Sequence, residues 1–252
     1  LREDARSNRP TALTEPWALP LSEARLSTFL AADTSNAEDA PDAFLSGRIV
    51  DAQARYNLNN LVQDGQIVPG ELAVLQRLFD NVGVASDLAQ RIADGLVAAV
   101  APAAADTGST ATAPLQPRKL SQLSWLGIDE GAIAQMQPYV VLLPTRTTVN
   151  LNTAPREVLA AVITDLDLAS AERIIQRRQR NAFRSPREVE AMIPPKTLDD
   201  RSVGVLSNYF EVTGRLRLDD WSLEERSLVQ RVGLDIIPLQ RERLTQREGA
   251  GS

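Results

Sequence analysis

The chain has 252 residues, of which 43% are hydrophobic and 24% charged, and its formal net charge at pH 7 is −6. This composition is ordinary for a globular protein and supplies enough apolar side chains for a sizeable core. The sequence contains neither cysteine nor histidine, which excludes disulfides, cysteine nucleophiles, histidine general bases and the usual zinc and copper sites. A bound metal would therefore be a hard cation with oxygen ligands, and calcium is the first candidate.

Charge and hydropathy disfavour two further classes. Proteins that bind nucleic acid through its phosphates carry clustered excess lysine and arginine, and this chain is acidic overall. The longest apolar stretch, residues 96–105, contains Pro102 and is far shorter than the ~18 residues that a membrane helix needs. Residues 1–6 are charged like the last turns of a helix that begins earlier, so we expect the chain to be a fragment that lacks a preceding helix.

The first zone, residues 1–58, mixes short elements. We predict a short helix over residues 22–32 and an acidic loop that ends at residue 42. Strands are predicted over residues 44–50 and 56–58, on either side of a turn, because both segments are rich in apolar and β-branched or aromatic residues.

The second zone, residues 59–205, is helical in pattern. Leu72, Leu75, Leu78 and Phe79 recur at helical spacing before Gly83, a residue typical of helix ends. Residues 101–117 are rich in alanine, threonine and proline and cannot bury enough apolar surface to offset the entropy of ordering, so we predict a disordered loop there. Further helices are predicted from residue 86, over residues 120–136 in two pieces, from residue 153, over residues 169–180, and from the capping box of residues 185–188.

The third zone, residues 206–252, returns to strands. Phe210, Val212, Leu216 and Leu218 alternate with polar residues, which is typical of a half-buried strand, and strand character continues to residue 239. The sequence therefore predicts an α+β fold. A discontinuous sheet domain would comprise residues 1–58 and 206–252, and an inserted α-helical domain would comprise residues 59–205.

Two short strings recur in the helical zone. Asn57-Leu58-Asn59 precedes one helical block and Asn150-Leu151-Asn152 precedes another, and both blocks carry Ala-x-Arg-Ile, at residues 89–92 and 171–174. Because the spacings differ, the pattern indicates either a diverged duplication or the general suitability of asparagine at a strand-to-helix turn.

The segment 149–192 resembles a helix-hairpin-helix module, with Asn-Leu-Asn-Thr-Ala, a helix, a tight turn and a second helix. In such modules a glycine-rich hairpin presents backbone N–H groups to a DNA phosphate. Residues 164–168 contain no glycine and carry Asp165 and Asp167, whose charges would repel a phosphate. We therefore predict that the shape is kept for packing and that the phosphate site is gone.

Two acidic segments are candidate calcium sites. Asp219, Asp220 and Glu224 lie where a hairpin tip would offer oxygen ligands at short spacing. The acidic loop offers a second set. Neither segment has a glycine-turned loop pattern, so an exposed, solvated turn is the alternative interpretation of both. The acidic-loop candidates are Asp33, Glu38, Asp39 and Asp42.

Residues 47–61, which read Gly-Arg-Ile-Val-Asp-Ala-Gln-Ala-Arg-Tyr-Asn-Leu-Asn-Asn-Leu, resemble the strand and Asn-Leu-Asn turn of the general secretion pathway protein K family of type II secretion. Residues 138–159 resemble the most recognisable segment of that family, and residues 207–212 resemble its return into the sheet. The resemblance covers nearly the whole chain in order. The motif residues that carry it are Asp51, Tyr56, Asn57, Leu58, Asn59, Asn150, Asn152, Thr153 and Pro155.

This resemblance implies a pilin-like antiparallel sheet with a large helical insertion, anchored in the inner membrane by an N-terminal helix that this chain lacks. It implies a non-enzymatic minor pseudopilin whose periplasmic domain caps the tip of the type II secretion pseudopilus together with minor pseudopilins I and J. The function would be to support protein export across the outer membrane. Some relatives bind calcium in the pilin part, and some contain cysteines that this chain lacks.

Two other functions stay open on the residues alone. A DNA-binding helix-hairpin-helix protein would bind duplex DNA in a salt-dependent manner through a basic cluster, whose simpler interpretation is a solvated helix face. An enzyme such as a carboxylate-dependent hydrolase would need two carboxylates that converge in a cleft with shifted pKa values. The basic cluster consists of Arg173, Arg177, Arg178 and Arg180.

Overall fold

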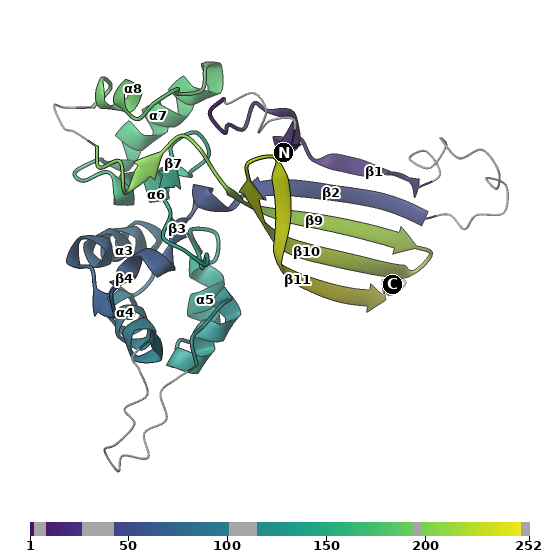
Figure 1. The fold of residues 1–252 in the computed structure, drawn as a ribbon, viewed down its shortest axis with the longest axis horizontal. Coiled ribbons are helices and arrows are strands. Elements are labelled where there is room, and N and C mark those ends of the chain that lie inside the picture. The colour runs from purple at the N-terminus through teal and green to yellow at the C-terminus, as the bar shows by residue number, and fades with distance from the viewer. Residues whose placement is uncertain (3–8, 27–42, 101–114, 194–197, 248–252) are drawn as a thin grey trace, which may run out of the picture. The chain divides into compact units, whose positions relative to one another are not determined.

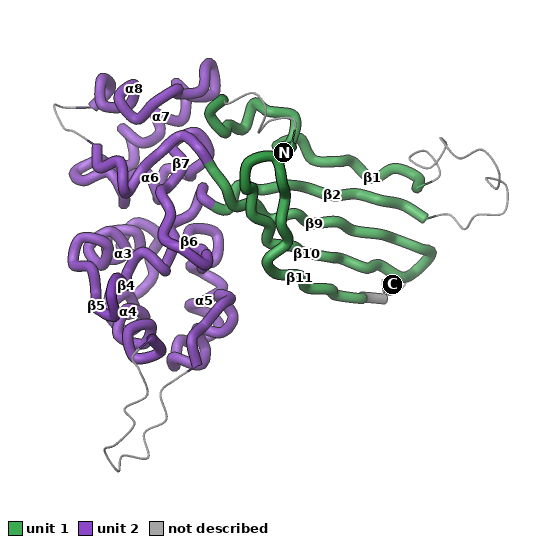
Figure 2. The backbone as a smooth tube through the Cα atoms, in the orientation of Figure 1, with its two compact units in different colours: residues 1–52, 207–252 green, residues 53–206 purple. Residues whose placement is uncertain are grey.

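A computed structural model describes residues 1–2, 9–26, 43–100, 115–193 and 198–247. The chain divides into two compact units (Figure 1, Figure 2): unit 1 comprises residues 1–52 and 207–252, and unit 2 comprises residues 53–206. The units thus meet along the chain at 52/53 and 206/207, where the sequence predicts 58/59 and 205/206.

Unit 1 contains a five-stranded sheet in the order β1-β2-β9-β10-β11. All neighbouring strands are antiparallel, and β9, β10 and β11 follow one another as hairpins. The prediction of an antiparallel sheet built from both ends of the chain is confirmed. The strands are β1 (Leu21–Arg25), β2 (Ala43–Asp51), β9 (Tyr209–Leu218), β10 (Trp221–Val232) and β11 (Asp235–Arg247).

A small aromatic core covers one face of this sheet. Trp17, Phe210 and Val229 are buried together. Trp17 lies in the 3₁₀ helix η1 (Pro16–Ala18) and packs edge-on against Phe210, with ring centroids 5.3 Å apart and an interplanar angle of 72°. The indole N–H donates to the carboxylate of Glu15 at 2.7 Å, so the polar part of the buried ring is satisfied.

The predicted helix over residues 22–32 is wrong in its first part. Leu21–Arg25 form strand β1, with Leu21 opposite Gly47 and Arg25 opposite Phe44 in β2. Alanine, glutamate and leucine favour a helix in isolation, but the open edge of β2 offers backbone hydrogen-bond partners, and such tertiary pairing overrides propensity. Residues 27–42, which include the acidic loop, lie outside the described residues.

Unit 2 is mainly helical, and its short strands form two-residue pairs. β3 pairs with β6 and β7 with β8 in parallel, and β4 pairs with β5 antiparallel. The helices are α3 (Pro69–Val82), α4 (Asp87–Val100), α5 (Glu130–Met136), α6 (Arg156–Val162), α7 (Leu168–Arg180) and α8 (Arg187–Glu190), with 3₁₀ helices η2 (Ala52–Ala54), η3 (Leu58–Leu61) and η4 (Leu120–Leu126). The strands are β3 (Tyr56–Asn57), β4 (Val62–Gln63), β5 (Gln66–Ile67), β6 (Val140–Val141), β7 (Val149–Asn150) and β8 (Val203–Gly204).

Helix α3 follows its sequence signals closely. It begins with Pro69, buries Leu75, Leu78 and Phe79, and ends where Gly83 adopts a left-handed φ of 71°. The predicted helix and its glycine stop are confirmed. These apolar residues join one continuous core that runs through all of unit 2. Among the described helices, none is long and apolar enough to span a membrane.

Two predicted features of unit 2 turn out differently. The capping box predicted at residues 185–188 does not form: Pro186 is the N-cap of the four-residue helix α8 and has no side-chain capping bond, and the carboxylate of Glu188 accepts from the N–H of Arg184 at 3.2 Å. The strand predicted over residues 56–58 pairs with β6 of unit 2 and not with the main sheet. The predicted disordered loop falls mostly on residues 101–114, which lie outside the described residues.

The two halves of unit 2 share a local plan. Each begins with a two-residue strand and an Asn-Leu-Asn turn, continues into two helices joined by a short turn, and is closed by a parallel two-residue strand. At the turns between the helices, three pairs of residues correspond at a separation of 82 positions: Gly83 and Asp165 have φ values of 71° and 55°, and Ala89 with Ala171 and Ile92 with Ile174 are buried pairs. This correspondence favours a diverged duplication.

Candidate functional site

The side chain of Asn57 joins two segments that are distant in sequence. Its Oδ1 accepts hydrogen bonds from the backbone N–H groups of Asn59 and Leu143, each at 3.1 Å. Its Nδ2 donates to the carbonyl of Thr145 at 2.7 Å and to the hydroxyl of Thr147 at 3.1 Å. These four hydrogen bonds use both donors of this buried amide and both lone pairs of its oxygen.

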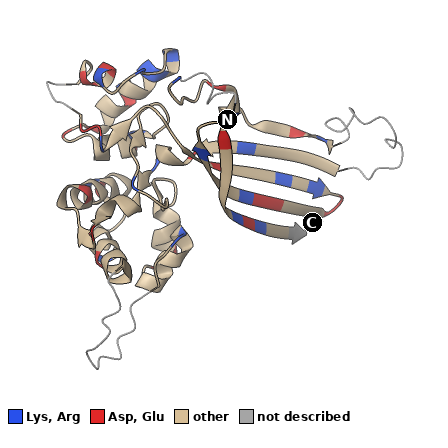
Figure 3. Cartoon of the chain, viewed as in Figure 1, with Lys and Arg blue, Asp and Glu red and all other residues tan. Residues whose placement is uncertain are grey.

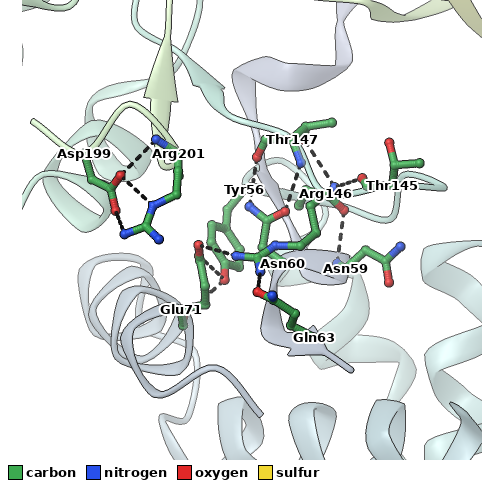
Figure 4. A network of polar contacts seen from close by, with 11 residues as sticks. Tyr56, Asn59, Asn60, Gln63, Glu71, Thr145, Arg146, Thr147, Asp199 and Arg201 are labelled. Carbon is green, nitrogen blue, oxygen red and sulfur yellow. Dashed lines mark hydrogen bonds and ion pairs between the residues drawn. The ribbon is translucent and has the colours of Figure 1, made fainter. Parts of the chain in front are cut away.

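The next two asparagines bind the same segment, and Figure 4 shows the bonds between Asn60 and Thr147. Asn59 Nδ2 donates to the carbonyl of Leu143 at 3.0 Å, and Asn60 exchanges two hydrogen bonds, at 2.9 and 3.0 Å, with the backbone of Thr147. We call residues 57–60 the first Asn turn. It fixes the segment 143–147 against β3, which closes the first half of unit 2.

The second Asn turn, residues 150–153, repeats this chemistry with different partners. Asn150 Oδ1 accepts from the N–H of Asn152 at 2.9 Å, as Asn57 does from the residue two positions later. The amide of Asn152 exchanges hydrogen bonds of 2.9 and 2.8 Å with the backbone of Phe183. Arg178 Nη1 donates to the carbonyl of Leu151 at 2.7 Å. The second turn therefore anchors α7 and the segment that follows it.

The basic cluster on α7 is divided between different environments. Arg178 is buried, and burial lowers its pKa to about 10. Arg177 lies over the ring of Phe183 at 5.7 Å and Arg173 binds the hydroxyl of Ser170 at 2.7 Å. Arg178 is thus removed from the surface of the cluster, whereas Arg173 and Arg180 are exposed.

The turn before α7 already holds an anion of its own. The carboxylate of Asp167 caps the helix by accepting from the N–H of Ser170 at 2.6 Å, and this hydrogen bond lowers its pKa. A phosphate at the same helix start would meet this charge. The geometry agrees with the interpretation that the hairpin serves packing.

A second polar cluster surrounds Glu71 in the first turn of α3 (Figure 4). The hydroxyl of Tyr56 donates to Glu71 Oε2 at 2.9 Å, and Arg146 Nη2 lies 3.4 Å from Oε1. Arg146 also donates to the amide oxygen of Gln63. Burial, the largest effect, raises the pKa of the Glu71 carboxyl above its usual value, and the bonds from Tyr56 and Arg146 partly offset it.

A cleft of about 780 Å³ opens beside this cluster. Its walls are α3, the end of α6, residues 146–148 and residues 198–202, so it lies wholly within unit 2. Three arginines and two carboxylates reach it. Its size falls in the range of small-ligand pockets, roughly 300–1,000 Å³. The charged residues are Arg77, Arg146, Arg201, Glu71 and Asp199.

Two carboxylates in one cleft are what the hydrolase interpretation requires, but both are engaged by protein donors. Glu71 is held by Tyr56 and Arg146, and both oxygens of Asp199 accept from the guanidinium of Arg201 at 3.1 and 3.2 Å. The bonds from Arg201 also lower the pKa of Asp199. Structural ion-pair networks shift pKa values in the same way as active sites do. We therefore interpret the cluster as a binding and packing feature.

Asp51 organises a buried network in unit 1. Ser207 donates its hydroxyl to Asp51 Oδ2 at 2.6 Å, and Arg231 Nη2 donates to the carbonyl of Ser207 at 2.7 Å. Thr11 joins by accepting from the N–H of Ser207 at 3.2 Å. The network fastens the end of β2 to the start of β9, where the chain leaves and re-enters the sheet.

The three predicted calcium ligands have different surroundings in the structure. Asp219 and Asp220 form the turn between β9 and β10, where Asp219 has a φ of 47°. Glu224 lies in β10 and pairs with Arg226 at 2.6 Å, within a region where basic and acidic residues alternate (Figure 3). Among the described residues, no group of three acidic residues is placed to hold a metal. Calcium binding stays a prediction, and the acidic-loop ligands lie outside the described residues.

Two protein-family models match the chain. Both are described as type II secretion system (T2SS), protein K; one covers residues 54–145 and the other residues 149–213, so together they span more than half of the chain. This chain belongs to the type II secretion system protein K family. One matched region begins just before the first Asn turn, and the other begins just before the second. Each Asn turn therefore lies at the start of a region that a family model matches.

Curated protein K sequences are similar over most of this chain. The type II secretion system protein K of Pseudomonas aeruginosa is 29% identical over 225 residues, which cover 82% of this chain and 63% of that protein. The protein K of Pectobacterium carotovorum subsp. carotovorum is 27% identical over 227 residues, which cover 79% of this chain and 69% of that protein. The chain thus spans a little less than two thirds of the Pseudomonas relative.

A solved structure has the same fold. One chain in the crystal structure of the GspK-GspI-GspJ complex from enterotoxigenic Escherichia coli matches with a TM-score of 0.72 at 19% identity, over 96% of this chain and 89% of that chain. This likeness confirms the mixed α+β fold with an antiparallel sheet and helices.

The family motif read from the sequence maps onto three separate contacts. The Asn residues build the two Asn turns, Tyr56 binds Glu71, and Asp51 binds Ser207. Leu58 and Thr153 are buried, and Pro155 is the N-cap of α6. Sequence reasoning missed Glu71, Arg146 and the cleft. One signal in the sequence could have pointed to Arg146, because this charged residue follows the apolar run of residues 139–143 almost directly.

Proposed function

We propose that this chain is the periplasmic part of a non-enzymatic minor pseudopilin that caps the tip of the type II secretion pseudopilus and nucleates its assembly. Unit 1 would be the pilin-like domain, and a preceding N-terminal helix would anchor the protein in the inner membrane. Membership of the protein K family and the fold shared with a chain of the GspK-GspI-GspJ complex support this role. By analogy with that complex, the partners would be minor pseudopilins I and J.

The observation that carries the tip position is the insertion of unit 2 between two neighbouring strands. β2 and β9 pair directly, yet residues 53–206 lie between them in sequence. Subunits of a narrow filament stack closely along its axis, and a subunit with an additional domain of this size cannot be covered by another subunit. Such a subunit fits at the end of the filament, where it would nucleate assembly and support protein export across the outer membrane.

Two features of the chain bear on the alternatives. The divided arginine cluster and the Asp167 cap favour a packing role for the helix-hairpin-helix-like segment over DNA binding. Calcium binding is a further part of this proposal: the family resemblance suggests the cation, and Asp219, Asp220 and Glu224 are chosen because they lie at or near the tip of the β9–β10 hairpin. Isothermal titration with calcium, against the Asp219→Asn variant, tests it directly: heat of binding in the parent that disappears in the variant supports the site.

The test of the proposed function is complex formation. The chain is mixed with the soluble domains of minor pseudopilins I and J from the same secretion system, and the mass of the product is measured by size-exclusion chromatography with light scattering. We expect a complex with one copy of each. In cells, a gold-labelled protein should mark filament ends; label spread along the shaft would contradict the tip position. A parallel titration with duplex DNA should give no saturable binding.

A further inference from the structure

The cleft beside α3 contains arginine side chains that are held in place and only partly neutralised by carboxylates. Arg77 donates Nε and Nη2 to the carbonyl of Ala161, at 3.0 and 2.8 Å, and pairs with no carboxylate in the part of the chain that the structure describes. Its guanidinium is therefore held in place by a neutral group. Planar guanidinium groups that are already fixed lose little entropy when they bind a carboxylate.

The other charges in the cleft do not cancel this excess. Arg146 lies 3.4 Å from Glu71 and is also held by the neutral amide of Gln63. Asp199 and Arg201 neutralise each other at the rim, where their side chains are 49% and 88% exposed. The cleft thus has three arginines against two carboxylates, although the chain as a whole has a net charge of −6. A local positive site on an acidic protein selects anionic groups.

Apolar side chains and hydroxyls complete the walls. Val74 and Val162, which come from α3 and α6, line the cleft together with Leu198. Thr148 and Ser202, which carry hydroxyl groups, line it as well. A site that is positive at some points and apolar at others matches a peptide segment that carries both acidic and apolar side chains.

We propose that this cleft binds a short peptide segment, supplied by a partner protein, that carries both acidic and apolar residues. The acidic side chains bond Arg77 and Arg146, and the apolar side chains pack against Val74, Val162 and Leu198. The apolar walls distinguish this ligand from a nucleic acid, whose backbone would present only phosphates to them. The proposal concerns unit 2 alone and stands independently of the position of the subunit in the filament.

The test uses fluorescence anisotropy with the full chain. The probe is the amidated peptide Gly-Leu-Asp-Val-Glu-Leu labelled with fluorescein, and the comparison peptide has Asn and Gln in place of Asp and Glu. We expect saturable binding of the acidic peptide that weakens with added salt, and at least about tenfold weaker binding of the neutral peptide. Equal affinity for both peptides, or no saturation by the acidic one, overturns the proposal.

Variants locate the binding. Arg77→Gln keeps a donor for the Ala161 carbonyl and removes the charge, so it should weaken binding by about tenfold while the unfolding midpoint stays near that of the parent. Arg146→Gln should have a similar effect, and Arg146→Lys should recover part of the loss. The matched control is Arg173→Gln, on the exposed face of α7 outside the cleft, which should bind like the parent. If Arg173→Gln weakens binding as much as Arg146→Gln does, the attraction is non-specific and the proposal fails.

Discussion

Asn57 and Asn150 show why asparagine occupies the start of each half of unit 2. In both turns the side-chain oxygen accepts the N–H of the residue two positions later, at 3.1 and 2.9 Å. Asn57 uses its amide nitrogen as well, for two donations to the segment 143–147. Aspartate could supply the acceptor but no donor, and it would add a buried charge.

We expect Asn57→Ala to lower the free energy of unfolding by about 2–4 kcal/mol, because it leaves several buried backbone groups without partners. Urea denaturation followed by circular dichroism measures this loss. Asn181→Ala is the matched control: the side chain of Asn181 is exposed, and its substitution should change stability by less than about 0.5 kcal/mol. Equal losses in the two variants would show that the first Asn turn has no special part in stability.

The carboxyl group of Glu71 makes the stability of the protein depend on pH, and the burial of this group determines the direction. Burial raises the pKa of this carboxyl above its usual value of 4.5, so the folded state holds the proton more tightly than the unfolded state does. Its contribution to stability is therefore full below the unfolded pKa and is lost as the pH rises through the folded pKa.

The variant Glu71→Gln cannot ionise and still offers an acceptor to Tyr56, so it should gain stability relative to the parent as the pH rises. The difference in unfolding midpoint between variant and parent should favour the variant more at about pH 7.5 than at about pH 4. Thermal unfolding at both pH values checks this. Glu130→Gln, at an exposed position in α5, serves as the control and should show a much smaller change between the two conditions. The opposite trend for Glu71→Gln would mean that its partners outweigh burial.

At the scale of elements, the sequence predicted best where the signals are local. The apolar stripe and the glycine stop predicted for helix α3 lie within residues 72–83, and both are present in the structure. β1 was missed because its strand conformation depends on β2, whose edge is invisible in the local sequence. The Ser-Pro-Arg-Glu string at residues 185–188 is a start signal, but it says nothing about helix length, and α8 ends after one turn and has no side-chain cap.

The candidate site follows the same rule. The Asn turns could be found because each is a contiguous string that repeats. The cleft could not, because its arginines come from positions 77, 146 and 201, and the nearest of these to one another in sequence are more than fifty residues apart. Which side chains share a cavity is determined by the packing of α3 against α6 and by the parallel strand pairs, neither of which has a local sequence pattern.

Two glycines of α3 should respond to alanine in opposite ways. Gly70 lies inside the first turn of the helix and has no neighbouring atom within 4 Å of an added Cβ, so Gly70→Ala should stabilise the protein by about 0.5 kcal/mol. Gly83 has a φ of 71°, where an L side chain is strained, so Gly83→Ala should destabilise it by about 1 kcal/mol. Urea denaturation of the pair provides its own control; shifts of the same sign would contradict the assigned left-handed helix end.

At the scale of the whole molecule, the insertion site has the geometry of a hairpin. Asp51 at the end of β2 is the register partner of Phe210 near the start of β9, so the two chain ends that leave and re-enter unit 1 lie side by side. The bond between Asp51 and Ser207 fastens them within unit 1 itself. The sheet is therefore continuous without residues 53–206, and each unit has a buried core of its own.

This geometry predicts that unit 1 survives the removal of unit 2. If residues 53–206 are replaced by a short Asn-Gly linker, the linker closes a hairpin between β2 and β9, and we expect a strand-rich circular dichroism spectrum and one cooperative thermal transition. The midpoint should be low, because a domain of this size buries little apolar surface. The control is Phe210→Ala in the shortened chain, which removes the central core aromatic and should abolish the transition, at a cost of about 3–5 kcal/mol.

A shortened chain without a cooperative transition would show that unit 1 needs unit 2 to fold. If the shortened chain folds, it also separates two possible causes of the proposed tip position. If the bulk of unit 2 excludes the subunit from the shaft, the shortened protein, produced with the N-terminal membrane helix that the proposed function requires, should become incorporated along the filament, as gold labelling would show. When contacts of unit 1 with its partners determine the position, label should stay at the filament ends, and the steric argument would be wrong.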